Sequence, residues 1–575
     1  MRQRVTKKTK RGGDPLIGAK SPRSVELSKW AFCRWILQHP RLALVFISLA
    51  ALIPFLDKPF NFDDPLFIWT ARHIQLHPAD PFGFDVNWYA KVMPMWQVTQ
   101  NPPLASYFIA LVTTVLGWSE MALHSAFLLP ASLVILGTYR LARHFCERPL
   151  LAALATLLTP VFLVSSTTVM CDVLMLSFWV WAVVFWFEGW AKEKSGFLFL
   201  SGLLMGLATL TKYFGIGLVP LLLAYSVFRL RRWEWRLVWL LVPVIALASY
   251  EVWTKRLYGH GLFSQAMEYA GGAKQNLGAS KTASIFIGLA FAGGSTGLVA
   301  LLAMRFWTGR RLLVIGLAGI LAALIPLASG MLFKRYTAPL ADARLAMDFQ
   351  FIIWVMMGLA VLVLAVEDFQ RNRDSNGILL ALWVVGTFVF ASFFNWEINT
   401  RSVLPLTPAV AILLARRLNN SAAKNDRSEF LILVSAAGLA LLVAWSDFRL
   451  AGACRSGAQN VADKLSHPVG TVWYQGHWGF QFYLDKLGLP AMDETSKLQA
   501  GDFVVVPLDN TCLIDLNPDA FELRETIITA GPRLLTTMSS GAGAGFYASA
   551  YGPLPFAFGA IAPEKVLILR LKSLQ

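Results

Sequence analysis

Long apolar stretches separated by short polar loops dominate this sequence and set the strongest limit on its fold. A helix of about 20 apolar residues is long enough to cross the hydrocarbon core of a bilayer. The sequence therefore predicts a multi-pass α-helical membrane protein with about 13 spans (range 11–14). We place these spans at 42–56, 120–139, 150–167, 173–190, 197–212, 214–228, 237–253, 284–304, 312–331, 348–366, 377–394, 401–415 and 429–446.

The composition agrees with a membrane protein. Apolar residues make up 56% of the chain and charged residues 15%, and the mean hydropathy is +0.53. Soluble proteins usually carry about 25% charged residues, and disordered chains are poorer in apolar residues. The five cysteines are too few for a disulfide framework, and none forms a C-x-x-C pair.

The positions of the basic residues explain the net charge of +16, which by itself suggests nucleic-acid binding. Cytoplasmic loops of membrane proteins are enriched in Lys and Arg. With the N-terminus in the cytoplasm, 11 of the 51 basic residues lie in residues 1–41 and 18 lie in loops on the same side. The charge is therefore a topology signal, and no nucleic-acid partner is predicted. Those loop residues are Arg140, Arg143, Arg148, Lys192, Lys194, Arg229, Arg231, Arg232, Arg236, Arg305, Arg310, Arg311, Arg371, Arg373, Arg416, Arg417, Lys424 and Arg427.

The apolar stretch 102–117 is the exception in this topology. If it were a span, every later Arg cluster would lie outside the membrane, against the rule for basic loops. We therefore expect a helix that lies at, or dips into, the outer face. The resulting domains are a basic cytoplasmic tail (1–41), a transmembrane domain (42–446) with a long first external loop (57–119), and an extracytoplasmic region (447–575).

The C-terminal region changes character. Turn residues and acids become frequent, and a strand is predicted at Thr471–Tyr474, a helix at Phe480–Leu487 and a second strand at Phe503–Val506. This order predicts a small extracytoplasmic α/β domain. Cys454 and Cys512 both fall in it, where a disulfide or two free thiols are the alternatives.

The first external loop carries an acidic pair, Asp63-Asp64, soon after the first span. Two adjacent carboxylates repel each other, and burial raises the pKa of at least one of them. Such a group accepts a proton from a hydroxyl or binds a divalent cation. The alternative is a solvated acidic loop.

Three further charged residues lie near the outer ends of spans. Asp172 lies between two apolar runs, where an acid also suits the positive end of a helix dipole. Lys212 has no other charged residue within fifteen positions, and it either extends outward to water or binds a lipid phosphate. Arg401 begins a span and either anchors it at the interface or pairs with a phosphate or with Glu397.

Two other segments are ambiguous. The Gly-rich loop 254–283 is either a mobile flap over a site or an unstructured connector. His73 and His77 lie four residues apart and would share a helix face, but Pro78 ends that helix, so a zinc site there is disfavoured. The sequence contains no phosphate-binding loop of an ATP-driven pump.

Together these features resemble the GT-C superfamily of membrane glycosyltransferases, in the branch of protein O-mannosyltransferases and the aminoarabinose transferase that modifies lipid A. In that branch the acidic pair is followed by an aromatic residue and then Ala, as Asp63-Asp64 is followed here by Phe67 and Ala71. The loop closes with an x-P-P-L element, here Asn101-Pro102-Pro103-Leu104.

Later elements resemble the same branch. A second external Asp matches Asp172, a T-K element matches Lys212, and an L-P-x-x-P element matches 404–408. Two departures are present. The pair is Asp-Asp where the branch usually has Asp-Glu, and Thr167 and Thr168 stand where an Arg often precedes the second Asp.

The resemblance implies an inverting glycosyltransferase, hexosyl or pentosyl, with a polyprenyl-phosphate sugar as donor. The acceptor would be a hydroxyl or phosphate of a lipid, glycan or protein at the outer face of the plasma (inner) membrane. Asp63 would be the catalytic base, and Asp64 and Asp172 would position acceptor or sugar. Lys212 and Arg401 would bind the donor phosphate. Asn101, Pro102 and Pro103 would form the loop element. No cofactor is required by the resemblance, although Asp63 and Asp64 offer a divalent-cation site.

Two other classes of function remain. A secondary transporter also has many spans, but it typically has internal repeats and charges near mid-membrane. A catalytically inactive GT-C-like assembly protein would share the fold. The joint presence of Asp63, Asp64, Asp172 and Lys212 argues against it.

Overall fold

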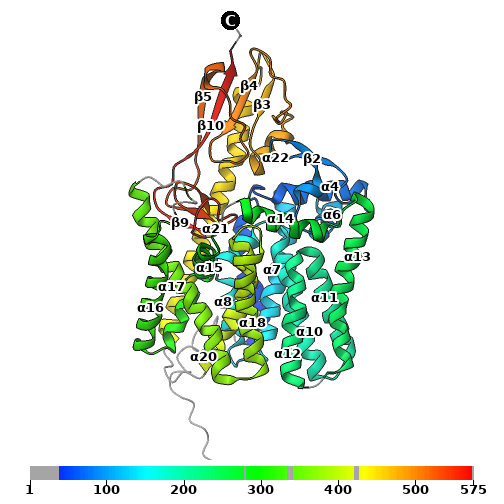
Figure 1. Cartoon of the computed structure of the whole chain (residues 1–575), viewed down its shortest axis with the longest axis vertical. Coiled ribbons are helices and arrows are strands. Elements are labelled where there is room, and N and C mark those ends of the chain that lie inside the picture. Colours follow the sequence, from blue (N-terminus) through cyan, green and yellow to red (C-terminus); the bar gives the residue numbers. More distant parts are fainter. Residues whose placement is uncertain are drawn as a thin grey trace, which may run out of the picture.

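The computed structural model describes residues 38–231, 233–276, 280–332, 336, 341–419 and 426–572. Residues 1–37 of the predicted basic tail lie outside the described residues. The chain forms a helical bundle with a smaller sheet region at one end, and Figure 1 shows the long helix α21 running from the bundle into that region.

The bundle is built from helices that coincide with the predicted spans. They are α3 (Pro40–Leu52) with η1 (Ile53–Phe55), α7 (Glu120–Ala142), α8 (Pro149–Leu157), α9 (Pro160–Ser166), α10 (Cys171–Ala191), α11 (Ser195–Thr211), η2 (Tyr213–Gly217), α12 (Leu218–Leu230), η3 (Trp235–Leu240), α13 (Leu241–Tyr258), α15 (Lys281–Thr296), η4 (Gly297–Arg305), α16 (Gly309–Ala328), α17 (Ala341–Asn372), α18 (Ser375–Val389), η5 (Phe390–Phe394), α19 (Thr400–Val403), η6 (Leu404–Leu406), α20 (Thr407–Asn419) and α21 (Asp426–Lys464).

Length and composition support the membrane assignment. In the described part of the chain, nine helices are long and apolar enough to cross a membrane, and a tenth span exists if α8 and α9, bent by 64°, are counted together. The shorter apolar helices 40–55 and 195–211 cover two more predicted spans. The chain is a multi-pass membrane protein, and the count of thirteen spans remains a prediction.

Several prolines explain why spans are broken. Pro160 begins α9 directly after the bend, because proline lacks an N–H and fits best in the first turn of a helix. Pro405 lies in the short η6 turn between α19 and α20. The span predicted at 401–415 is therefore broken near its start, and Arg401 lies on the short helix α19.

The first external loop forms three helices and a hairpin. These are α4 (Asp64–Leu76), α6 (Leu104–Leu116), the short α5 (Met95–Val98), and strands β1 (Asp85–Asn87) and β2 (Val92–Pro94). Figure 1 shows α4 and α6 beside each other at the end of the bundle that faces the sheet region. The stretch 102–117 thus forms a short apolar helix at this end, as expected.

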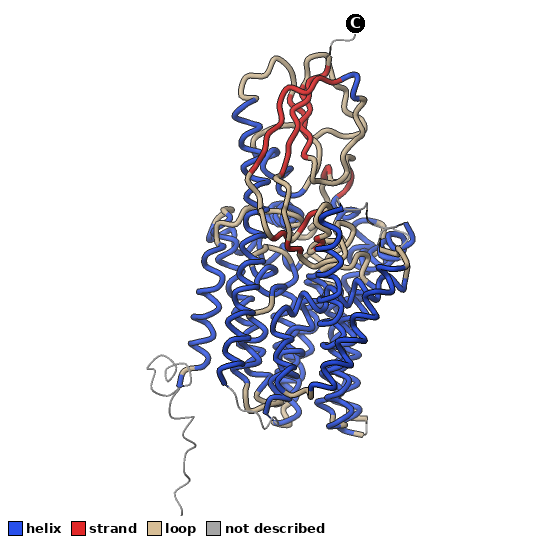
Figure 2. Tube along the Cα trace, turned by 90° about the vertical axis from the view of Figure 1, so that its left-hand side faces the viewer, coloured by secondary structure: helices blue, strands red, loops and turns tan. Residues whose placement is uncertain are grey.

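The C-terminal region forms the α/β structure that the sequence predicts. A four-stranded sheet has the order β3-β4-β10-β5, with β3 (Val472–Tyr474) parallel to β4 (Phe503–Pro507). β10 (Glu564–Leu571) pairs antiparallel with both β4 and β5 (Phe521–Thr529), and α22 (Trp478–Lys486) packs nearby. Two separate two-stranded sheets lie in the same region. They pair β6 (Leu535–Thr536) with β9 (Ala557–Phe558), and β7 (Met538–Ser539) with β8 (Ala544–Gly545). Figure 2 shows the strands gathered at this end alone.

The boundary at residue 447 falls inside α21, which is one continuous helix of 39 residues. The main apolar core likewise contains bundle residues together with Phe546 and Leu554 of the C-terminal region. The division into a transmembrane domain and a C-terminal domain remains a prediction, because α21 and a shared apolar core connect them.

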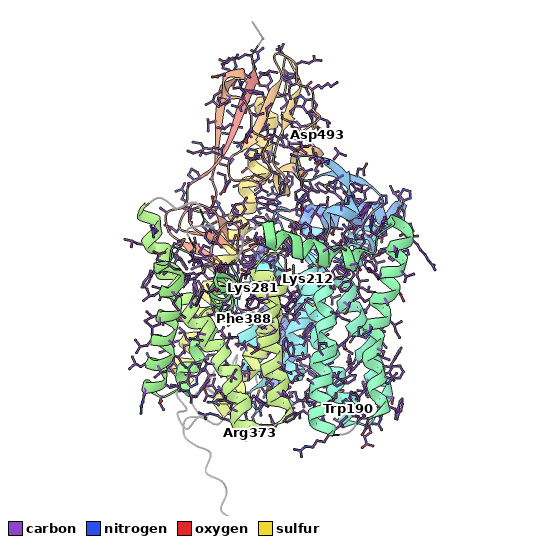
Figure 3. All side chains as sticks on the ribbon, viewed as in Figure 1. Trp190, Lys212, Lys281, Arg373, Phe388 and Asp493 are labelled. Atoms are coloured by element: carbon purple, nitrogen blue, oxygen red, sulfur yellow. The ribbon has the colours of Figure 1, made fainter. Side chains whose placement is uncertain are left out.

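The loops predicted to be cytoplasmic lie at the end of the bundle away from the C-terminal region. Figure 3 places Trp190, near the end of α10, and Arg373, after α17, at the end opposite Asp493 of the C-terminal region. Lys212 lies at the end that faces this region. Loops predicted to be cytoplasmic and the C-terminal region are thus on opposite ends, as the topology requires.

Candidate active site

Asp63 and Arg401 form an ion pair, although 338 positions separate them. Asp63 precedes the first residue of α4, and an Arg401 Nη atom lies 2.7 Å from its carboxylate Oδ2. The Arg401 side chain is 12% exposed and that of Asp63 is 35% exposed. A guanidinium is a strong hydrogen-bond donor to carboxylate, so this contact fixes both groups at the bundle end.

Asp172 and Lys212 form the second ion pair. Lys212 follows α11 in an extended conformation, and its Nζ lies 2.6 Å from Oδ1 of Asp172 in the first turn of α10. Arg401 also lies 3.6 Å from Oδ2 of Asp172. The carboxylate of Asp172 is only 1% exposed, and a buried charge requires such partners. The four side chains form a continuous row of alternating charge.

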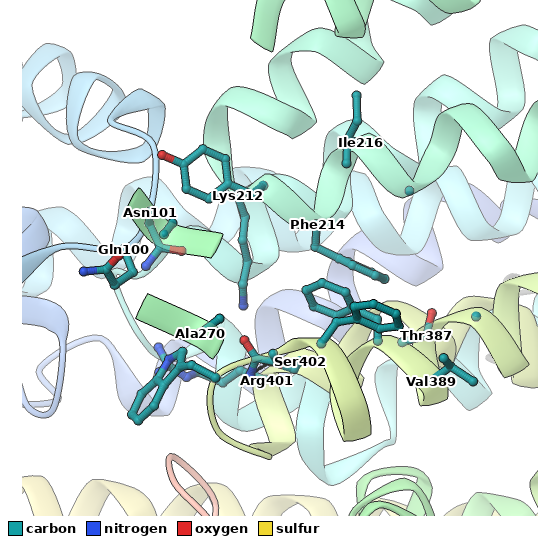
Figure 4. A pocket seen from close by; sticks show the side chains of 18 of the residues that line it. Gln100, Asn101, Lys212, Phe214, Ile216, Ala270, Thr387, Val389, Arg401 and Ser402 are labelled. Carbon is teal, nitrogen blue, oxygen red and sulfur yellow. Dashed lines mark hydrogen bonds between the residues drawn. The ribbon is translucent and has the colours of Figure 1, made fainter. Parts of the chain in front are cut away.

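A cavity of about 560 Å³ opens beside this row. Asp63, Lys212 and Arg401 line its charged end, together with Gln100 and Asn101. Figure 4 shows Lys212 and Arg401 approaching the cavity from opposite sides. The apolar part is lined by side chains of α10, η2, α12, α18 and η5, including Trp179, Phe214, Leu221, Trp383 and Phe390.

Helix α14 (Leu262–Asn276) covers part of this cavity. Phe263, Met267 and Tyr269 of this helix are among the lining residues. The unstructured connector that we considered for 254–283 is therefore incorrect for 262–276, despite the adjacent Gly271 and Gly272. Contact of the apolar face of α14 with the bundle outweighs the low helix propensity of glycine. Mobility of this segment as a flap remains a prediction.

Asp64 has a different environment from its neighbour Asp63. Its carboxylate is 1% exposed and accepts backbone N–H groups of Asn61 and Val169, each at 3.0 Å. Burial raises the pKa of Asp64 to about 7, against the lowering effects of Lys58 and of these hydrogen bonds. Asp64 thus connects the start of the first external loop to the segment before α10.

Asp64 and Asp172 do not line the cavity. Asp172 contacts the lining residues Lys212 and Arg401, and Asp64 is the neighbour of the lining residue Asp63. Their predicted contact with acceptor or sugar remains a prediction. In the loop element, Asn101 lines the cavity, whereas Pro102 and Pro103 are buried directly before α6. The prolines therefore hold Asn101 at the cavity rather than facing it themselves.

The metal hypothesis concerns Asp63 and Asp64. Their carboxylates have separate partners, a guanidinium for Asp63 and backbone N–H groups for Asp64. No cluster of three or more His, Cys, Asp or Glu able to hold a metal occurs in the described ranges. The rings of His73 and His77 lie 4.7 Å apart, and Cys454 and Cys512 are free thiols. A cation between Asp63 and Asp64 would first have to displace Arg401.

Three residues next to the site are not predicted from the sequence. Lys58 and Asp447 form a buried ion pair, with 2.5 Å between Nζ and Oδ2. The Tyr547 hydroxyl donates to the same Asp447 oxygen at 2.9 Å, and the Arg401 guanidinium lies 5.4 Å from the Tyr547 ring centroid. A charge directly after the apolar run 429–446 was a signal for Asp447, but nothing local marks Tyr547.

Comparisons with known proteins agree with the expected class. Residues 100–253 match the family model described as dolichyl-phosphate-mannose-protein mannosyltransferase. This segment contains Asn101, Asp172 and Lys212. The match confirms the predicted resemblance to membrane glycosyltransferases that use polyprenyl-phosphate donors. Among curated protein sequences, none matches the chain.

Solved structures give weaker similarities. A crystal structure of the Archaeoglobus fulgidus oligosaccharyltransferase, tethered with an acceptor peptide, has a TM-score of 0.45 and 13% identity over 80% of this chain and 65% of that one. ArnT from Cupriavidus metallidurans in the apo state has a TM-score of 0.41 and 17% identity over 84% and 94%. ArnT bound to undecaprenyl phosphate gives 0.40 and 16% over 81% and 93%. In the peptide-tethered archaeal structure, the matched part is thus just under two thirds of that chain.

Proposed function

We propose that this protein is an inverting glycosyltransferase that moves a sugar from a polyprenyl-phosphate donor to an acceptor at the outer face of the membrane. The observation that carries the proposal is the cavity. Its charged end holds two cations and one carboxylate, and its apolar part runs between membrane helices α12 and α18. A phosphate attached to a long isoprenoid chain would fit such a cavity, with the phosphate at the two cations and the chain in the apolar part.

Lys212 and Arg401 are placed to bind the phosphate of the donor. Both line the cavity, and both are held by the buried carboxylate of Asp172. The phosphate carries more negative charge after it leaves the sugar than before. Two preorganised cations therefore stabilise the departing group more than the ground state, which lowers the barrier.

Asp63 is placed to accept the proton of the acceptor. The acceptor oxygen bonds to the anomeric carbon, the bond from that carbon to the phosphate oxygen breaks on the opposite face, and the acceptor proton moves to Asp63. Phosphate would compete with Asp63 for Arg401, and this competition would release the carboxylate for the proton transfer. Asp172 acts by holding Lys212 and Arg401, and Asp64 acts by holding the start of the first external loop.

The topology adds a location to this proposal. If the basic loops face the cytoplasm, the cavity opening and the C-terminal region are extracytoplasmic. In a bacterial cell this corresponds to the plasma (inner) membrane. The acceptor is then a lipid, glycan or protein that reaches the outer face. The transporter alternative is not favoured, because the charged row lies at the end of the bundle.

Asp63→Asn tests the proposal. Membrane lipids and surface glycans are compared by mass spectrometry between cells with the wild-type gene, the deletion, Asp63→Asn and Asp57→Asn. Asp57 is exposed in the same loop and does not line the cavity, so it is the matched control. We expect one sugar modification to disappear in the deletion and in Asp63→Asn only. Full modification in Asp63→Asn would remove Asp63 as the base.

A further inference from the structure

Phe62, the residue directly before Asp63, has an unusual backbone conformation. Its φ is +49°, in the left-handed region that side chains other than glycine rarely adopt. A bulky residue keeps such a conformation only when surrounding contacts determine it. Because Phe62 and Asp63 are adjacent, those contacts also set the direction of the Asp63 carboxylate.

The contacts of the Phe62 ring come from the C-terminal region. The ring stacks on Tyr547 with 3.8 Å between centroids and an interplanar angle of 21°, and it lies 5.2 Å from Trp478. Phe62 and Tyr547 are each 5% exposed. Two rings in this arrangement gain stacking energy in addition to apolar burial.

Tyr547 also contacts the other member of the ion pair. The Arg401 guanidinium lies 5.4 Å from the Tyr547 ring centroid, within the range of a cation–π interaction. Neighbouring backbone groups tie the same segments together. Thr400 N–H donates to the Phe546 carbonyl at 2.9 Å, and Ser549 N–H donates to the Ile398 carbonyl at 2.8 Å.

We propose that Tyr547 is a positioning residue of the active site, which holds Phe62 and Arg401 so that Asp63 and the guanidinium keep their reactive geometry. This inference rests on the proposed function. It adds a residue of the C-terminal region to a site whose cavity-lining residues all precede that region. The C-terminal region is then a component of the site and not only a neighbouring domain.

The Tyr547 side chain is itself fixed at its hydroxyl end. The hydroxyl donates to Asp447 Oδ2, and Asp447 is bound by Lys58 and by the Thr537 hydroxyl at 2.6 Å. Lys58 lies four residues before Phe62. The contacts through Asp447 and Tyr547 therefore connect two points of the first external loop. The ring provides the contacts to Phe62 and Arg401, whereas the hydroxyl provides the anchor.

The test measures binding of undecaprenyl phosphate to full-length protein in nanodiscs. We expect Tyr547→Leu to raise the Kd about tenfold, because Arg401 loses its support, and Tyr547→Phe to stay within about twofold, because the ring remains. Tyr551→Leu is the matched control, since Tyr551 lies in the same loop and its ring contacts Trp478. In an Arg401→Gln background, Tyr547→Leu should have no further effect.

The outcomes separate this inference from the proposed function. Wild-type protein that does not bind undecaprenyl phosphate overturns the proposed function. Wild-type binding that is unchanged in Tyr547→Leu, or additive effects with Arg401→Gln, overturns the role of Tyr547. Equal losses in Tyr547→Leu and Tyr551→Leu also overturn it, because they indicate general loss of the loop. If Tyr547→Leu does not fold, Phe62→Leu removes the same stacking from the other side and is judged by the same criteria.

Discussion

The Lys58 ammonium lies 2.5 Å from the Asp447 carboxylate across a sequence separation of 389 residues, and both side chains are almost fully buried. Lys58 follows the first span, and Asp447 lies in the middle of α21. The ion pair therefore joins the start of the first external loop to the helix that leads into the C-terminal region. Thr167 and Tyr547 provide further hydrogen bonds to it.

Removing one partner of this pair should strongly destabilise the protein. Lys58→Met leaves the Asp447 carboxylate buried without its cation, and loss of one partner of a buried pair typically costs about 3–5 kcal/mol. We expect a clear fall in Tm in detergent, measured by thermal unfolding. The double variant Lys58→Met/Asp447→Leu should recover much of the loss, because no buried charge remains.

Lys464→Met is the control for this experiment. Lys464 forms an ion pair with Glu525, and both side chains are more than 40% exposed. Exposed pairs contribute about 0–1 kcal/mol, so its Tm should change little. Equal Tm values for Lys58→Met and wild type would show that the buried pair does not contribute to stability.

The sequence predicted the features that depend on local pattern. The apolar runs predicted the spans, and the charge of the loops separated 102–117 from them. Apolar runs and turn residues predicted strands close to β3 and β4 and a helix close to α22. Asp63 stands out as part of an acidic pair in the first external loop, and Lys212 and Arg401 stand out as charges near the outer ends of spans. The structure brings all three to one cavity.

What the sequence did not show depends on contacts between distant segments. Nothing near Asp63 indicates that its partner is Arg401, and nothing near Phe62 indicates a stacking partner at Tyr547. The strand β5 was not predicted, because most of its side chains are exposed or partly exposed and its sequence has no long apolar run. The strand β10 was not predicted either, although it contains an apolar run at 566–569. In the sequence Asp64 looks equivalent to Asp63. In the structure Asp63 lines the cavity, whereas the next residue, Asp64, is buried and accepts backbone N–H groups.

Lys212→Ala should weaken binding of the donor phosphate. A hydrogen bond from a charged group contributes about 1.5–3 kcal/mol, which corresponds to about tenfold to a hundredfold in Kd. Binding of undecaprenyl phosphate to protein in nanodiscs measures this loss. Lys91→Ala is the control, because Lys91 is exposed in the first external loop and does not line the cavity. An unchanged Kd in Lys212→Ala would remove this residue from the phosphate site.

Asp64 should make stability depend on pH. Burial raises the pKa of Asp64 from 3.8 to about 7, so between these values the folded state binds more protons than the unfolded state. Stability therefore falls as pH rises, and this contribution is complete below about pH 4 and lost above about pH 7. The Tm of wild type relative to Asp64→Asn should decrease from pH 5 to pH 8. A constant difference across this range would contradict the raised pKa.

Chelation should leave sugar transfer unchanged. Arg401 already neutralises Asp63, and both Asp64 oxygens accept backbone N–H groups, so the pair offers few of the carboxylate oxygens that a divalent cation prefers. Transfer is measured in purified membranes before and after EDTA treatment, with Mg²⁺, Mn²⁺ or Zn²⁺ added back. A loss that one of these ions restores would show that a metal takes part and that Arg401 moves away from Asp63.

Two native cysteines allow a direct test of membrane orientation. Cys512 is exposed in the C-terminal region, and Cys146 is partly exposed between α7 and α8, on the side of the predicted cytoplasmic loops. If the basic loops face the cytoplasm, a membrane-impermeant maleimide should label Cys512 in intact cells. Cys146 should react only after permeabilisation. Cys512→Ser identifies the first signal and Cys146→Ser the second. Labelling in the reverse order would invert the topology and place the cavity opening on the cytoplasmic side.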